Sequence, residues 1–201
     1  MGKPPRRRRR SREEAEREIL DAARTLLAER PSYEVTVAAI MARTTLSRKS
    51  FYVYFRDRYA LLKRLVQPLQ AQRDAIVEDL RRDDEDPASG ARTALLRLAS
   101  LYAEHGPLLR ALAEASSQDR EARRTWREFI EPVIAGHAEM IREEISRGRI
   151  TGIDPDQTAR ALIGMNLQFF FDQLVDDPDP DVEAAADTLL TIWTRALYGS
   201  A

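Results

Sequence analysis

The hydrophobic positions of this chain recur at three- and four-residue spacing over almost its whole length, which is typical of amphipathic α-helices. In residues 12–29 the apolar residues that would share one helix face are Ala15, Ile19, Ala22, Ala23, Leu26 and Leu27. No segment shows sustained period-two alternation, and glycine is scarce, with 8 residues in 201. The pattern therefore predicts an all-α fold of about nine helices.

Capping residues and prolines predict where these helices begin and end. We expect helices over 12–29, 37–43, 48–54, 58–82 with a kink at Pro68, 91–104, 107–116, 119–147 with an interruption at Pro132, 156–174 and 181–198. The expected N-caps are Thr36, Ser47, Asp57, Asp154 with Gln157 completing a capping box, and Asp179 before Pro180. Loops are expected at 83–90 and 148–156, and Gly199 is expected to stop the last helix.

The two short helices at 37–43 and 48–54 have the dimensions of a helix-turn-helix. In such a unit the second helix lies in the major groove of DNA, so Arg48, Lys49 and Ser50 in its first turn would face bases or phosphates. The helix N-termini at Thr36, Ser47 and Asp57 would offer free backbone N–H groups to phosphate oxygens. This pair is the candidate nucleic-acid site.

Four of the chain's 14 aromatic residues lie within five positions, in "FYVYF" (51–55). Aromatic side chains beside cations can form a stacking platform for single-stranded nucleic acid. The alternative is ordinary helix core, because Phe51 and Phe55 are four residues apart and would share one face. We adopt the second interpretation, since the flanking sequence predicts a helix pair and not an open sheet.

Charge is distributed unevenly, although the net charge is only −1. Residues 1–66 contain 17 Lys/Arg and 8 Asp/Glu, leaving 15 of the 32 basic and 25 of the 33 acidic residues for 67–201. The N-terminal part therefore suits a polyanion. We expect a disordered arginine-rich arm at 1–11, a DNA-binding domain at 12–66, and a separate acidic domain at 67–201.

The arm, with Arg6–Arg10, has two interpretations. It either enters the adjacent minor groove or adds nonspecific, salt-sensitive affinity as a solvated polycation. An alternative function follows from it, namely a nonspecific nucleic-acid-coating protein that the arm drives.

Other functional classes find little support in the residues present. There are no cysteines, and the two histidines, His105 and His137, are too few for a metal site and are expected to be structural. No nucleophile, base and oxyanion donor form a pattern, so we expect no enzyme, metal or cofactor, although an acyl-modifying enzyme is a second alternative. No apolar run of about 18 residues or secretory signal is present, and a cytoplasmic protein is expected.

Residues 35–66, "VTVAAIMARTTLSRKSFYVYFRDRYALLKRLV", resemble the DNA-binding signature of the TetR (tetracycline repressor) family. The resemblance implies that Tyr52 reaches a phosphate, that Tyr54 donates where many members have histidine, and that Arg58 replaces the usual lysine anchor. Thr45 would lie near the groove.

The turn departs from that signature. Thr44-Thr45-Leu46-Ser47 replaces the usual Ala-Gly-Val-Ser, so we expect about 1 kcal/mol of local strain or a different turn shape.

The second half resembles the ethionamide-pathway repressor branch of this family, through "ALIGMNLQFFFDQL" (161–174), "IWTRALYG" (192–199) and Trp126. That branch has a long apolar tunnel. The residues expected to line a tunnel here are Trp126, Phe129, Ile130, Val133, Asn166, Phe170 and Trp193. For any single member, plain helix core is the alternative.

The family resemblance implies that residues 67–201 form a ligand-binding and dimerisation domain. It further implies a homodimeric repressor that leaves a near-palindromic DNA operator when a small hydrophobic effector binds. The helices at 156–174 and 181–198 would pair with their twofold mates. The expected exposed apolar residues of that interface are Leu174, Leu189, Leu190, Ile192 and Leu197.

Overall fold

A computed structural model of the chain describes residues 11–82 and 87–199, and over these residues it contains nine α-helices, one short 3₁₀ helix and no strand. The all-α prediction is confirmed. The elements are α1 (Arg12–Glu29), η1 (Ser32–Glu34), α2 (Val37–Ala42), α3 (Arg48–Tyr54), α4 (Arg58–Val66), α5 (Leu69–Arg82), α6 (Pro87–Gln118), α7 (Arg120–Ser146), α8 (Pro155–Leu174) and α9 (Val182–Tyr198).

Local capping explains most of the N-terminal helix starts. The side chain of Thr36 accepts a hydrogen bond from Ala39 N, and the Asp57 carboxylate accepts from Tyr59 N and Ala60 N, as predicted for caps. Ser47 is the N-cap residue of α3, but its hydroxyl makes no capping bond to the backbone. Helices α4 and α5 are separate, with the break at Gln67-Pro68 where a kink was expected.

A complete capping box joins Ser11 and Glu14 at the start of α1, which the sequence pattern did not predict. Ser11 therefore belongs to α1 as its cap, while residues 1–10 of the predicted arm lie outside the described residues. At α8 the Asp154 carboxylate accepts from Gln157 N at 2.8 Å, so the cap is confirmed, but the reciprocal Gln157 side-chain bond of a full box is not formed.

Four predictions about helix boundaries after residue 82 are wrong. The segment 87–90 belongs to α6 and not to a loop, because proline is well tolerated at a first helical position; residues 83–86 lie outside the described residues. The predicted helices 91–104 and 107–116 form one helix, and α7 continues through Pro132. Asp181, not Asp179, caps α9 by accepting from Ala184 N.

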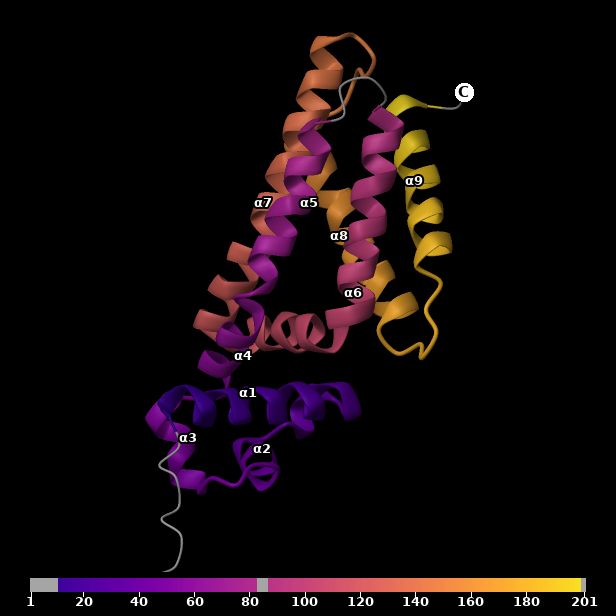
Figure 1. The fold of residues 1–201 in the computed structure, drawn as a ribbon. Helices are drawn as coiled ribbons and strands as arrows, with labels where there is room; N and C mark the ends of the chain where they lie inside the picture. The colour runs from indigo at the N-terminus through magenta and orange to yellow at the C-terminus, as the bar shows by residue number, and fades with distance from the viewer. Residues whose placement is uncertain (1–10, 83–86, 200–201) are drawn as a thin grey trace, which may run out of the picture.

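The helices α5–α9 form an elongated bundle, and α1 lies across one end of it (Figure 1). Helix α6 bends within its length, so that its second half runs alongside α1. Pro107 lies inside α6 and removes a backbone donor there, which accounts for the bend. The preceding Gly106 lies so close to Val175 that an added Cβ would come within 2.3 Å of Val175 Cγ2.

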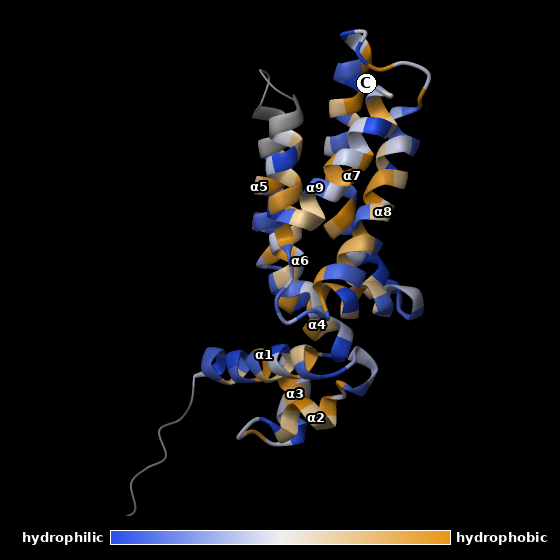
Figure 2. Ribbon diagram, turned by 90° about the vertical axis from the view of Figure 1, so that its right-hand side faces the viewer, coloured by the Kyte–Doolittle hydropathy of each residue, from blue (hydrophilic) through white to orange (hydrophobic). Residues whose placement is uncertain are grey.

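The buried apolar side chains form one continuous cluster that extends from Ile19 in α1 to Leu197 in α9. Figure 2 shows hydrophobic and hydrophilic stripes alternating around the helices, as expected for amphipathic elements packed on a shared core. None of the described helices is long and apolar enough to cross a membrane.

Candidate DNA interface and ligand core

The α2–α3 pair lies at the end of the molecule that points away from the α5–α9 bundle, with α1 between them (Figure 1). Its hydrophobic anchors are inside: Ile40 and Met41 of α2, Phe51 of α3, and Phe55 are all buried. The interpretation of Phe51 and Phe55 as core is therefore confirmed. Because these residues face inward, the opposite side of α3 is left to solvent.

The turn between α2 and α3 avoids the expected strain by adopting a different shape. No described residue other than glycine has a positive φ. The Thr44 hydroxyl donates to Met41 O at 2.9 Å and accepts from Leu46 N at 3.3 Å. Thr45 N donates to the Glu18 carboxylate of α1 at 2.6 Å. Side chains thus satisfy backbone N–H groups of the turn, and the turn needs no glycine.

Most of the predicted DNA contacts lie on the solvent side of this pair. The exposed members are Thr36, Thr45, Ser47, Arg48, Lys49 and Tyr52, and Ser50 is half-buried. Within the described part of the chain, Arg48 and Lys49 form no hydrogen bond or ion pair, so both cations are available to an external anion. The Ser47 and Ser50 hydroxyls lie 2.9 Å apart. Tyr52 is 57% exposed.

Two further predicted contacts are less exposed. Tyr54 is half-buried and packs against the core. Arg58, at the first position of α4, is also half-buried; its Nη2 donates to Tyr59 Oη at 3.1 Å, and its guanidinium carbon lies 4.9 Å from the Tyr59 ring centroid. The structure therefore directs Arg58 partly toward the protein.

Side-chain ion pairs connect the segment between α3 and α4 to the bundle. Arg56 pairs with Asp57 at 2.8 Å and with Glu121, in the first turn of α7, at 2.7 Å. Burial of the Asp57 carboxyl opposes its ionisation, but hydrogen bonds from Ala60 N and Arg56 hold its pKa below the ordinary value. Asp57 therefore stays a charged cap of α4.

The predicted ligand residues come together in the interior of the α5–α9 bundle. Phe129, Ile130, Val133, Asn166, Phe170 and Trp193 are buried, and Trp126 is half-buried. Asn166 accepts a hydrogen bond from Trp193 Nε1 at 3.0 Å through its side-chain oxygen. Its side-chain nitrogen is buried without a partner in the structure. An unpaired buried donor is costly, so this amide is a candidate for a polar contact with a ligand.

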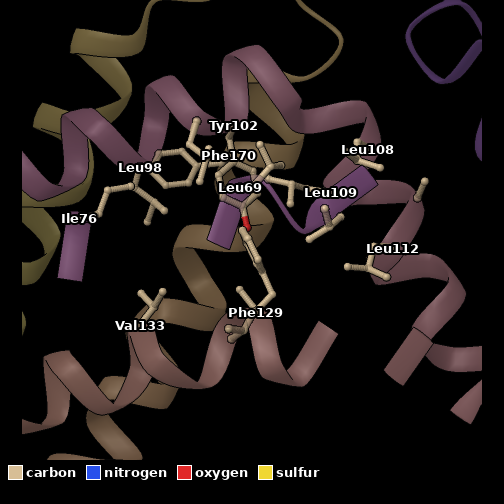
Figure 3. Close-up of a cluster of buried hydrophobic side chains, with 14 of the residues drawn as sticks. Leu69, Ile76, Leu98, Tyr102, Leu108, Leu109, Leu112, Phe129, Val133 and Phe170 are labelled. Atoms are coloured by element: carbon tan, nitrogen blue, oxygen red, sulfur yellow. The ribbon is translucent and has the colours of Figure 1, made fainter. Parts of the chain in front are cut away.

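Sequence reasoning missed Tyr102 of α6. Its ring lies 5.4 Å from that of Phe170 and 5.3 Å from that of Phe171, and Figure 3 shows it among the buried side chains of α5–α8. Burial raises the pKa of its hydroxyl above the ordinary value, and the hydroxyl has no hydrogen-bond partner. A lone tyrosine within the apolar stripe of residues 94–112 was the available signal.

The prediction of which residues form the exposed dimer interface is partly wrong. Leu174, Leu189 and Leu197 point into the protomer and are buried, because α8 and α9 use these positions to pack on the bundle. Ile192 is 39% exposed, Leu190 is half-buried, and Gly164 of α8 is exposed with open space around it. Among the described residues, no group of three or more His, Asp or Glu side chains is arranged to hold a metal ion.

Comparison with known proteins agrees with this architecture. Residues 19–65 match "Bacterial regulatory proteins, tetR family", and residues 91–199 match "Transcriptional regulator EthR, C-terminal domain". The chain is 30% identical over 185 residues to the HTH-type transcriptional regulator EthR of Mycobacterium tuberculosis, which covers 90% of this chain and 86% of that protein.

Two solved structures share the fold. NalD, the secondary repressor of the MexAB-OprM multidrug efflux pump in Pseudomonas aeruginosa, has a TM-score of 0.72 at 22% identity, over 92% of this chain and 98% of that one. FadR from Bacillus subtilis in complex with stearoyl-CoA has a TM-score of 0.70 at 20% identity, over 92% and 99%. The chain belongs to the TetR family of bacterial transcriptional regulators, and its C-terminal part is of the EthR type.

Proposed function

We propose that this transcriptional regulator is a ligand-responsive repressor that acts as a homodimer on a near-palindromic operator. The observation that carries the proposal is the first turn of α3, where Arg48 and Lys49 are exposed, unpaired within the described chain and far from the bundle. Residues 12–66 would form the DNA-binding domain and residues 67–201 the ligand-binding and dimerisation domain.

The proposed DNA contacts divide by chemistry. Arg48, Lys49 and Ser50 read base edges or phosphates from the first turn of α3, and arginine is well suited to guanine edges. Tyr52 contributes a phosphate contact through an exposed hydroxyl. The remaining proposed contacts to the backbone or groove edge are Thr36, Thr45, Ser47, Tyr54 and Arg58.

A largely apolar effector is proposed for the core of the α5–α9 bundle. Support comes from two buried polar groups without partners, the Asn166 side-chain nitrogen and the Tyr102 hydroxyl, within a wall of aromatic side chains. A few convergent polar groups in an apolar interior are typical of small-molecule sites. The complex of the fold relative FadR with stearoyl-CoA is compatible with an acyl-like molecule.

The proposed mechanism is a population shift between two states of the dimer. Without ligand, the two α3 helices lie about one DNA turn apart, ~34–36 Å. Helix α4 packs against both α6 and α7, and α7 carries Phe129, Ile130 and Val133. A ligand that moves α7 or α6 would therefore displace α4, change the spacing of the α3 helices and lift repression.

The proposal is tested by operator binding with and without effector. An operator is first selected from random duplex DNA, and molecules that co-purify with the protein are identified by native mass spectrometry. We expect a near-palindromic sequence and weaker binding once the bundle is loaded. Equal affinity of the loaded and empty protein would contradict the release mechanism, and a lack of sequence preference would contradict the repressor function.

A further inference from the structure

A cavity lies at the junction between the N-terminal helices and α6, outside the aromatic core of the bundle. It has a volume of about 350 Å³. Its apolar wall comes from α1, α2 and α4 on one side and from the second half of α6 on the other; the residues are Leu27, Ile40, Leu61, Leu62, Ala111 and Ala115. The volume lies within the range of small-molecule sites in proteins.

The bend in α6 creates this junction. Because the second half of α6 runs alongside α1, Ala111 and Ala115 face the N-terminal helices and not the centre of the bundle (Figure 1). Both are alanines, so the apolar part of the α6 wall is made of small side chains, while Glu114 and Gln118 of the same helix also line the cavity. An occupant would contact both parts of the molecule at once.

Two charged side chains, Arg58 and Glu114, line the cavity and differ in their hydrogen-bond partners. Arg58 lines it, is half-buried, and forms no ion pair within the described part of the chain; its one hydrogen bond is to the Tyr59 hydroxyl. Glu114 also lines the cavity, but its carboxylate already accepts a hydrogen bond from the Ser32 hydroxyl. A guanidinium has five N–H donors in a fork suited to a carboxylate. The Ser32 hydroxyl is neutral, so Glu114 keeps its negative charge, and an anion in the cavity would be held at Arg58.

We propose that this junction cavity is a second effector site, which binds a small apolar carboxylic acid. The carboxylate pairs with Arg58, and the hydrocarbon part lies between Leu61, Leu62 and the two alanines of α6. A cationic amine would be attracted by Glu114 but repelled by Arg58, and a neutral molecule would leave the Arg58 guanidinium without a counter-ion in a half-buried position. An acid supplies the counter-ion that Arg58 lacks and fits the apolar wall.

Occupancy of this site has a regulatory consequence, which rests on the proposed function. Arg58 is also a proposed contact of the DNA backbone. A guanidinium whose charge is paired with a carboxylate in the cavity offers fewer N–H donors and less net charge to a phosphate outside it. The acid should therefore weaken operator binding and remove one phosphate contact from each protomer.

Binding is tested first, without DNA, on the full chain with labelled isoleucine methyl groups and octanoate as the probe. Ile40 lines the junction cavity, whereas Ile130 and Ile163 lie in the bundle core. We expect octanoate to shift the Ile40 signal, octanamide to shift it far less, and Arg58→Met to weaken octanoate binding by roughly tenfold or more. Shifts confined to Ile130 and Ile163, or equal binding of acid and amide, would overturn the site.

The regulatory half is tested on the selected operator as a function of salt concentration. Octanoate should lower affinity and reduce the slope of log K against log salt by about 0.9 for each lost phosphate contact. Ala115→Leu, which fills the cavity and keeps Arg58, should abolish both effects. If octanoate shifts Ile40 but leaves operator affinity unchanged, the regulatory inference fails while the repressor proposal stands. Absence of specific DNA binding would instead reject the proposed function.

Discussion

At the scale of single residues, the aromatic side chains at 51–55 divide between the protein core and the solvent-exposed surface. Phe51 and Phe55 are buried and hold the helix pair together, whereas Tyr52 is exposed although its ring lies 5.4 Å from that of Phe51. Arg48 precedes them in the exposed first turn. Removal of a hydroxyl and removal of a base-reading cation should therefore have different consequences.

Tyr52→Phe removes one hydroxyl and leaves the ring packed on Phe51. It should weaken binding to all DNA sequences alike, because a phosphate contact carries no sequence information. Arg48→Ala should cost about 1–3 kcal/mol on the operator and change which bases are preferred. Repeating the selection from random DNA with each variant measures the difference; an unchanged preference for Arg48→Ala would assign Arg48 to the backbone.

His137 is a second case in which one residue carries a measurable property. It is buried in α7, its Nδ1 lies 2.7 Å from Val133 O, and its ring centroid lies 4.8 Å from that of Trp193. Burial disfavours the imidazolium and lowers the pKa of His137 to about 4 from 6.5. The folded protein therefore keeps this ring neutral where the unfolded chain takes up a proton.

The free energy of unfolding should fall as pH falls through this window. Below pH 6.5 the unfolded state is protonated and stabilised, so stability declines until about pH 4, where the folded state also binds the proton. The contribution is roughly 3 kcal/mol in total. His137→Gln should reduce the loss between pH 7 and pH 4.5 by roughly 2 kcal/mol in urea unfolding.

Some pH dependence should persist in His137→Gln, because burial also lowers the pKa of His105. If the variant and the parent chain lose equal stability, the His137 ring is not the group that titrates.

At the scale of helices, a side chain of α5 supplies a hydrogen bond that the backbone of α7 lacks. Pro132 has no N–H, so Glu128 O lacks its usual donor four residues on. Arg73 of α5 is buried, and its Nη1 donates to Glu128 O at 2.7 Å and to Phe129 O at 2.9 Å. Its guanidinium carbon also lies 5.5 Å from the Phe129 ring centroid. Helix α7 can therefore remain continuous through a proline.

Arg73→Met should destabilise the fold by roughly 1–3 kcal/mol, because it leaves the part-buried Glu128 O without a donor and removes the buried hydrogen bond to Phe129 O. In a Pro132→Ala background the missing N–H is restored, so the same change should cost at least about 1 kcal/mol less. Urea unfolding of the four proteins measures this coupling. Equal costs in both backgrounds would show that Arg73 stabilises through Phe129 and not through the break.

The helices also show which parts of the fold the sequence could predict. Thr36 and Asp57 were predicted as caps because a cap depends on residues within one turn. The continuity of α6 was not predictable in this way, because Gly106 and Pro107 locally favour a helix end, and the close approach of Gly106 to Val175 arises only in the folded chain. Tyr102 and the junction cavity were missed for the same reason, since both follow from where the bent α6 lies. The exposed first turn of α3 was predicted because motif spacing fixes it.

At the scale of the whole molecule, charge and architecture agree. The basic residues concentrate in 1–66 and the acidic ones in 67–201, and the α2–α3 pair lies at the end away from the bundle. A polyanion is attracted to one end and repelled by the other, which orients the protein on DNA before any specific contact forms.

Deletion of residues 1–10 separates the contribution of the arginine arm from that of α3, and it keeps the Ser11–Glu14 capping box intact. We expect weaker overall binding and a shallower salt dependence, because several cations are lost. The ratio of operator to scrambled-sequence affinity should persist. Its disappearance would favour a nonspecific coating protein.

The continuous core has a consequence for how the chain folds. Leu61, Leu65 and Val66 of α4 are buried in the same cluster as the residues of α6 and α7. A fragment that ends after α4 would expose these side chains to water, so residues 12–66 should not fold stably on their own. The whole protomer should unfold in one cooperative step, and an effector that stabilises the bundle should raise the melting temperature of the DNA-binding helices as well.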